Sequence, residues 1–148
     1  MTATTSTESL TRSAARLRLA ITRTARRLRQ EAAGELTPTS GAALATVERH
    51  GPLTPSELAH LERVQRPTAT RIVARLEKAA LVERAGDPAD GRISLVSITR
   101  QGTELLRRVR TRKNAYLARQ LRELDPADVA ILEDTTEVLE RMLERERR

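Results

Sequence analysis

Between residues 54 and 99 the apolar side chains change their spacing, and this change most limits what the chain can fold into. They recur first at helical intervals, in two short segments at about 55–61 and 65–80. From Leu81 the spacing is that of strands, in 81–84 and 93–98, with a Gly-, Pro- and Asp-rich turn between them. Two short helices joined by a tight turn form a helix-turn-helix, and a hairpin directly after them forms a wing. The expected fold is mainly α with one small β-hairpin (α+β).

Helix-start signals divide the rest of the chain. Thr54 is a predicted N-cap, Pro55 suits the first helical turn, and Glu57 completes a capping box three residues on. Pro38 and Pro126 mark two further starts, and Thr99 is predicted to cap a long helix that runs to about residue 122. We expect a disordered tip at 1–8, a helix at 9–34, the winged unit at 37–99 and two helices at 100–148, as one domain overall.

The formal net charge of +7 and a sequence pI near 11.2 favour a polyanionic partner, although a solvated Arg-rich surface has the same composition. Charge alone does not separate the two, so the positions of the cations must decide. Tyr116 is the one aromatic residue, which argues against single-stranded nucleic acid because bases there stack on aromatic side chains. Duplex DNA remains as a polyanion that needs no stacking platform.

Several other classes of protein are disfavoured. Without cysteine the chain has no disulfide, zinc-thiolate site or thiol switch, which fits a reducing cytoplasm. No apolar run approaches the roughly 20 residues of a membrane span, and the first residues do not resemble a secretory signal. His50 and His60 do not match a metalloprotease spacing, and no Gly-rich phosphate loop is present. We expect no enzyme activity, no metal and no cofactor.

The segment 66–80 has two distinct faces when its residues are placed at about 100° intervals. Ala69, Ile72, Val73, Leu76 and Ala80 form the predicted core face. The opposite face is cationic and hydroxyl-bearing, with Pro67, Arg71, Ala74 and Lys78 flanked by Thr68, Thr70 and Arg75. Arg and Thr with small neighbours suit contact with phosphates and base edges in the major groove, whereas an ordinary solvated helix would carry many of the same residues.

The wing and the preceding helix add further candidate contacts. Asp90 precedes Arg92 at the hairpin tip, where a single arginine suits a narrow minor groove and the carboxylate is placed to orient it. Arg84, on the other strand, is expected to contact flanking backbone or to pair with Asp90. Thr54 and Ser56 lie at a helix start, where backbone amides favour a phosphate. A plain polar turn and simple capping are the alternatives.

From Thr37 to Gly102 the chain resembles the multiple antibiotic resistance regulator (MarR) family. The resemblance rests on Leu53–Ala59, Arg66–Arg71, Arg75–Glu77 with Leu81–Arg84, Asp87–Arg92 and Leu95–Thr99. It implies a winged helix-turn-helix flanked by long helices, a dimer, duplex DNA as partner, and action as a repressor. Two positions depart from the family pattern. Gln65 replaces the serine cap of many members and is expected to contact DNA instead, and Ala80 replaces a frequent glycine.

The expected DNA contacts are Thr54, Ser56, Gln65, Arg66, Pro67, Thr68, Thr70, Arg71, Arg75, Arg84, Asp90 and Arg92. The winged unit cannot cover the apolar stripes of the outer helices, which would be an aggregation liability if left exposed. A twofold mate would cover them, and an intramolecular three-helix bundle is the alternative. The expected dimer contacts are Leu10, Leu17, Ile21, Leu117, Leu121, Leu132, Leu139, Met142 and Leu143.

The resemblance also implies release from DNA by a small, often aromatic or phenolic anion, bound between the dimerisation region and the winged unit. The candidate lining residues are Arg16, Ala20, Leu44, His50 and Tyr116, each of which packing or surface exposure would equally explain. A rival function of a different class is a winged helix that binds a protein partner. The cations at Arg71, Arg75 and Arg92 argue against that rival. The expected location is the cytoplasm, in association with the nucleoid.

Overall fold

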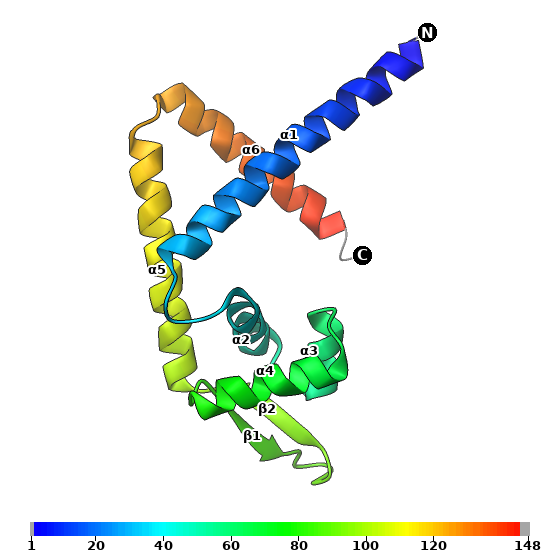
Figure 1. Cartoon of the computed structure of the whole chain (residues 1–148), viewed down its shortest axis with the longest axis vertical. Coiled ribbons are helices and arrows are strands. Elements are labelled where there is room, and N and C mark those ends of the chain that lie inside the picture. Colours follow the sequence, from blue (N-terminus) through cyan, green and yellow to red (C-terminus); the bar gives the residue numbers. More distant parts are fainter. Residues whose placement is uncertain (1, 146–148) are drawn as a thin grey trace. The chain divides into compact units, whose positions relative to one another are not determined.

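The computed structural model describes the backbone of residues 2–145 and the side chains of residues 7–145. Helices and strands follow the expected order, and the mainly helical fold with one antiparallel hairpin is confirmed (Figure 1). The chain divides into two compact units, residues 1–113 and 114–148. The elements are α1 (Thr2–Glu31), α2 (Pro38–His50), α3 (Pro55–Leu61), α4 (Arg66–Lys78), β1 (Val82–Gly86), β2 (Ser94–Ile98), α5 (Arg100–Arg122) and α6 (Pro126–Arg145).

The core of the first unit joins α2, α3, α4, the hairpin and the first turns of α5. Its largest fully buried side chains are Leu44, Leu58, Leu76, Val47, Val73 and Val96. Leu53, between α2 and α3, exchanges two backbone hydrogen bonds with Val96 and so adds a short third segment beside β2. Burial of this set fixes α3 and α4 against the hairpin, since each side chain removed from water stabilises the unit by about 1.5–3 kcal/mol.

The predicted helix start at Pro38 and the predicted cap at Thr99 are confirmed. The hydroxyl of Thr37 accepts a hydrogen bond from the backbone N–H of Ser40, and Pro38 occupies the first turn of α2. The hydroxyl of Thr99 accepts from the N–H of Gly102 and donates to the carbonyl of Ala80. These bonds satisfy backbone donors that helix formation leaves without partners, so the boundaries follow from local chemistry.

The core face of α4 is confirmed at Ala69, Ile72, Val73 and Leu76, all of which are buried. The prediction for Ala80 is wrong: α4 ends at Lys78, and Ala80 is exposed with φ of +58°. The chain turns there through the left-handed region before β1 begins, which explains why a glycine would suit this position. The hairpin is antiparallel, with Val82 opposite Ile98 and Gly86 opposite Ser94.

The first helix starts earlier than expected. The backbone is helical from Thr2 through the residues expected to form a disordered tip, and Met1 lies outside the described residues. Residues 2–8 lack an apolar period, but they contain no glycine or proline and so nothing in them ends a helix. Every described side chain from residue 7 to residue 24 is exposed, and burial begins only near Ala25, Leu28 and Ala32.

The second unit contains the end of α5 and all of α6. The division falls within α5 rather than at its start, because Leu105 and Leu106 in its first turns belong to the core of the first unit. None of the twenty residues of α6, all of which the structure describes, is buried. Ile131 and Leu143 are each 60% exposed, which leaves a large apolar surface on this helix without cover in the single chain.

Candidate nucleic-acid interface

The start of α3 is held by a complete capping box. The carboxylate Oε2 of Glu57 accepts hydrogen bonds from the backbone N–H of Thr54 at 2.7 Å and from its hydroxyl at 2.9 Å, while the N–H of Glu57 donates to that hydroxyl oxygen. The backbone hydrogen bond, followed by the hydroxyl bond, lowers the pKa of Glu57. Thr54 therefore caps α3, the helix that supports α4. This is the capping role that was the alternative to phosphate contact for this residue.

A second contact fixes the first turn of α4 to α3. Nη2 of Arg66 donates a hydrogen bond of 2.5 Å to the hydroxyl of Ser56. Two residues on the expected DNA surface are thus bonded to each other in the free protein. The arrangement holds the guanidinium of Arg66 at the junction of the two helices and leaves its other N–H groups available to a ligand.

The face of α4 opposite the core is exposed, and it carries most of the expected contacts. Gln65 is the N-cap residue by backbone conformation, but its side chain makes no capping hydrogen bond. Thr70 donates to the carbonyl of Arg66 at 3.0 Å, and Nε of Arg71 donates to the carbonyl of Pro67 at 3.4 Å. Both side chains therefore lie back along the helix, whereas Thr68 is half-buried. Pro67 is exposed beside them.

Besides Arg66, which is bonded to the Ser56 hydroxyl, four cations of this surface have no carboxylate partner within the described part of the chain: Arg71, Arg75 and Lys78 on α4, and Arg92 on the wing. All four are exposed. Elsewhere, arginines pair with nearby carboxylates, for example Arg100 with Glu104 and Arg110 with Glu48. An exposed helix face with unpaired cations and no bulky apolar residue is what entry into the major groove requires.

The wing differs from the sequence-based expectation at two residues. Arg84 does not pair with Asp90: its Nε lies 3.1 Å from Oε2 of Glu77 on α4, and its contact with flanking DNA backbone stays a prediction. Asp90 accepts a hydrogen bond from the backbone N–H of Arg92 instead of orienting the guanidinium. A backbone donor two residues on is the ordinary partner of an aspartate in a turn. Asp90 thus shapes the turn, and the exposed side chain of Arg92 has no carboxylate partner among residues 7–145.

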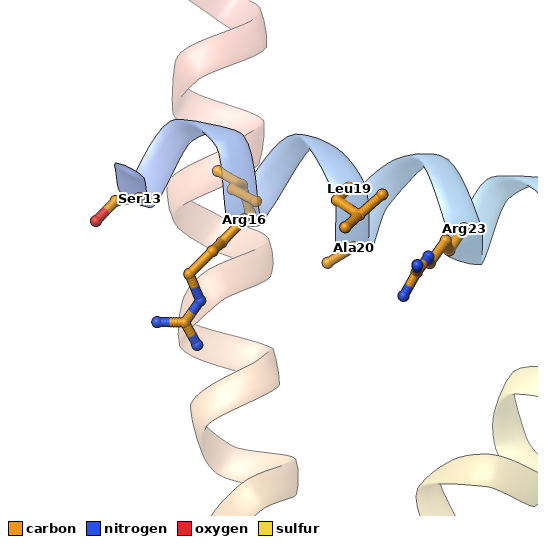
Figure 2. A pocket seen from close by; sticks show the side chains of 6 residues that line it. Ser13, Arg16, Leu19, Ala20 and Arg23 are labelled. Carbon is orange, nitrogen blue, oxygen red and sulfur yellow. The ribbon is translucent and has the colours of Figure 1, made fainter. Parts of the chain in front are cut away.

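The candidate effector residues of the first unit do not share one hollow. Arg16 and Ala20 line a hollow on α1 with Ser13, Leu17, Leu19 and Arg23 (Figure 2). His50 lines a different hollow beside α3, with His60 and Leu61 among its neighbours. Leu44 is fully buried in the core and has no surface that a ligand could touch, and Tyr116 is a half-buried residue of the second unit.

A cavity that sequence reasoning missed lies within the first unit, between the end of α1, the start of α2 and α5. Its volume of about 710 Å³ is in the range of small-molecule sites. The walls are mostly apolar and small, including Leu36, Gly41 and Ala45, and four cations line it: Arg26, Arg29, Arg110 and Lys113. The sequence contains one signal for this cavity. Arg26 with Arg29, and Arg110 with Lys113, are pairs of cations three residues apart on helices that are distant in the chain.

One wall of this cavity is tied to α5 by ion pairs. Oε1 of Glu35 lies 3.6 Å from Nε of Arg108, and Oε2 lies 3.5 Å from Nη1 of Arg112. Oε2 is buried and makes no hydrogen bond, so the two guanidinium charges are what stabilises it there. Glu35 thereby links the segment after α1 to α5.

The expected dimer contacts are all at least partly accessible in the single chain. Seven of the nine are exposed, including Leu10 at 68% and Met142 at 51%, while Leu117 and Leu139 are half-buried. None of the helices in the described part of the chain combines the length and apolar character of a bilayer span.

Comparison with known proteins relates this chain to a family of regulators. A model of the MarR family matches residues 36–94, which cover the winged unit up to the start of β2. An uncharacterised HTH-type transcriptional regulator of Mycobacterium bovis is 35% identical over 129 residues, covering 86% of this chain and 90% of the relative.

Solved structures show the same fold. A transcriptional regulator of Pseudomonas aeruginosa, at 30% identity, superposes with a TM-score of 0.82 over 91% of this chain and 96% of the other. A variant of MepR from S. aureus, solved bound to an oligodeoxyribonucleotide, shares the fold at 19% identity, with a TM-score of 0.68 over 90% of this chain and 96% of the other. The chain therefore belongs to the MarR family of DNA-binding, winged helix-turn-helix transcriptional regulators.

Proposed function

We propose that the protein is a repressor that binds a pseudo-palindromic operator as a homodimer, in the cytoplasm, on the chromosome. The observation that carries this proposal is the set of four unpaired cations on α4 and the wing tip. In a twofold dimer, two copies of α4 would enter major grooves about 34 Å apart, one helical turn of the operator. The MepR variant, which shares this fold, was solved with DNA, in support of the same mode of contact.

Within this surface, Thr68, Thr70 and Arg71 contact base edges or adjacent phosphates in the major groove, and Arg92 enters the minor groove. Gln65 adds a base contact, because its side chain is not used to cap α4. Thr54 and Ser56 act mainly by holding α3 and Arg66 in place, since their hydroxyls are already engaged. Arg75 neutralises phosphates. Arg84 and Asp90 shape the wing.

The first prediction separates base from backbone contacts. Arg71→Ala should weaken operator binding by about 1–3 kcal/mol and relax the sequence preference at one position of each half-site. Arg92→Ala should weaken binding with less change in preference. Fluorescence anisotropy with a labelled upstream fragment, and with single-base variants of it, measures both effects. Arg107→Ala, an exposed arginine of α5, is the matched control. Operator affinity of Arg71→Ala equal to that of the native protein would refute the assignment.

A small organic anion is the proposed effector, and the cavity between α1, α2 and α5 is the proposed site. Its apolar walls suit the body of such a ligand, and its four cations suit the charge. Binding there would change the separation of the two α4 helices through α5 and so release DNA. Titrating aromatic carboxylates into the DNA complex, with Lys113→Ala as the comparison, tests this step. Release that is equally efficient in Lys113→Ala would exclude the cavity.

A protein partner is the alternative function for the winged unit. The same anisotropy experiment discriminates between the two, with excess nonspecific DNA present. Failure to bind any fragment of the adjacent genomic region would favour the protein partner.

A further inference from the structure

The walls of the cavity between α1, α2 and α5 limit the shape of ligand that it can take. Among the described residues that line it, none is aromatic, and Tyr116, the one aromatic residue of the chain, is not among them. The apolar walls are leucine, valine, alanine, proline and glycine. Aromatic side chains orient a flat aromatic ligand by stacking on it. These walls suit an aliphatic body instead, because close packing against it needs no stacking partner.

The cavity carries more positive charge than one anionic group neutralises. Arg26 and Arg29 lie on α1, and Arg110 and Lys113 lie on α5, so the cations form two pairs on two helices. Within the described part of the chain, no carboxylate pairs with Arg26, Arg29 or Lys113. Arg110 is engaged, since its Nη2 lies 2.6 Å from Oε2 of Glu48. Three unpaired cations therefore border one cavity.

The two pairs of cations repel each other across this space. No described aspartate or glutamate lines the cavity, and its mostly apolar walls screen charge less well than water does. A ligand with one anionic group meets one pair of cations and leaves the other uncompensated. A ligand with an anionic group at each end meets both pairs, and the aliphatic body between the ends covers the apolar walls.

We propose that the cavity binds an aliphatic dianion. Arg26 and Arg29 on α1 hold one anionic group, and Lys113 with Arg110 on α5 holds the other. Arg110 contacts the ligand and Glu48 together, because its guanidinium has five N–H donors. This inference rests on the effector site proposed above and narrows its ligand from a small organic anion to one that bridges α1 and α5.

Calorimetric titration of the free protein gives the first test, with carboxylates of matched chain length as probes. Glutarate, suberate and sebacate carry two carboxylates, whereas pentanoate, octanoate and decanoate carry one on the same number of carbons. In at least one matched pair the dicarboxylate should bind about tenfold or more tightly, because it alone meets both pairs of cations. Benzoate represents an aromatic monoanion. Benzoate or the monocarboxylates binding as tightly as every dicarboxylate overturns the proposal.

Variants at the two ends of the cavity assign the contacts. Arg26→Ala with Arg29→Ala should weaken binding of the preferred dicarboxylate about tenfold or more, to the level of its monocarboxylate. Lys113→Ala should act in the same direction. Arg49→Ala with Arg107→Ala removes two exposed arginines of the same unit that do not line the cavity, and as the control should bind normally. Equal weakening in the control would indicate attraction by net charge alone and refute the site.

The partner of Arg110 supplies a change of opposite sign. Glu48→Gln keeps the shape of the side chain and removes the charge that competes with the ligand for Arg110. The variant should therefore bind the dicarboxylate about three- to tenfold more tightly than the native protein. Binding that is unchanged or weaker in Glu48→Gln contradicts the proposed contact with Arg110.

Filling the cavity tests where the ligand binds. Gly41 lines it on α2, and a β-carbon added there would meet, outside its own helix, only the β-carbon of Leu36 at 4.0 Å. Gly41→Met should therefore fold, which circular dichroism and urea unfolding check, and should abolish binding of the dicarboxylate without changing any charge. Native binding by folded Gly41→Met would place the ligand elsewhere on the arginine-rich surface and refute the proposal.

Titrating the same probes into the DNA complex separates this inference from the function on which it rests. Release of DNA by the preferred dicarboxylate supports both. A dicarboxylate that binds the free protein as predicted but does not release DNA contradicts the effector role and leaves the ligand class supported. Release by benzoate, without binding or release by any dicarboxylate, supports the effector role and refutes the dianion.

Discussion

Ala80 adopts a backbone conformation that is unfavourable for a residue with a β-carbon. Its φ of +58° places an alanine in the left-handed region, which costs a residue with a β-carbon about 1–2 kcal/mol. Glycine removes that cost but loses about 0.4–1 kcal/mol through the freedom it adds to the unfolded chain. Ala80→Gly should therefore stabilise the protein by about 0.5–1 kcal/mol.

The neighbouring alanine supplies the control for this prediction. Ala79 has φ of −83°, so Ala79→Gly gains no relief of strain and should destabilise by about 0.5–1 kcal/mol. Urea unfolding of both variants at equal protein concentration measures the two changes. Equal destabilisation by the two substitutions would show that residue 80 is not left-handed in solution.

At the scale of elements, the ion pair between Glu77 and Arg84 joins the end of α4 to the first strand of the wing. Both side chains are partly exposed, so the pair should stabilise by about 0.2–1 kcal/mol, measurable as coupling in a double-mutant cycle. Arg84→Ala should accordingly lower stability and change operator affinity little. Arg92→Ala should do the opposite, because its guanidinium has no partner in the free protein. Operator affinity lost equally in both variants would contradict this division.

The success of sequence reasoning differed between elements for physical reasons. Caps and turns depend on residues three or four apart, so the starts of α2, α3 and α5 were predictable from Thr37, Thr54 and Thr99. Contacts between elements were not: the partner of Arg84 depends on how α4 and β1 pack, and the cavity needs three distant segments. The start of α1 was missed because an unbroken helix needs no signal to continue.

The DNA surface can be predicted from the sequence only where it depends on residues close together in the chain. The faces of α4 follow from the helical period, and the cations on its outer face were named correctly as exposed residues. That Ser56 holds Arg66, and that Asp90 binds a backbone N–H, depends on exact side-chain geometry. Residue type therefore predicted the surface, whereas the division into contacting and supporting residues needed the structure.

For the whole molecule, salt acts on two equilibria at once. Each phosphate contact releases counterions and adds about −0.9 to the slope of log affinity against log salt concentration. Arg71, Arg75, Lys78 and Arg92, counted in both copies of a dimer, give a slope no steeper than about −7. Loss of the dimer at high salt would steepen the apparent slope, so the titration must be run far above the dimer dissociation constant.

Under that condition Lys78→Ala should make the slope shallower by about 2, one contact in each copy, and should weaken binding to every DNA sequence alike. Arg107→Ala, exposed on α5 and among neither the expected DNA contacts nor the expected dimer contacts, should leave the slope unchanged. Repeating the titration below the dimer dissociation constant should steepen both slopes equally, because neither substitution changes an expected dimer contact. A slope that Lys78→Ala does not alter would remove the C-terminal end of α4 from the DNA interface and confine phosphate contact to its first turns and the wing.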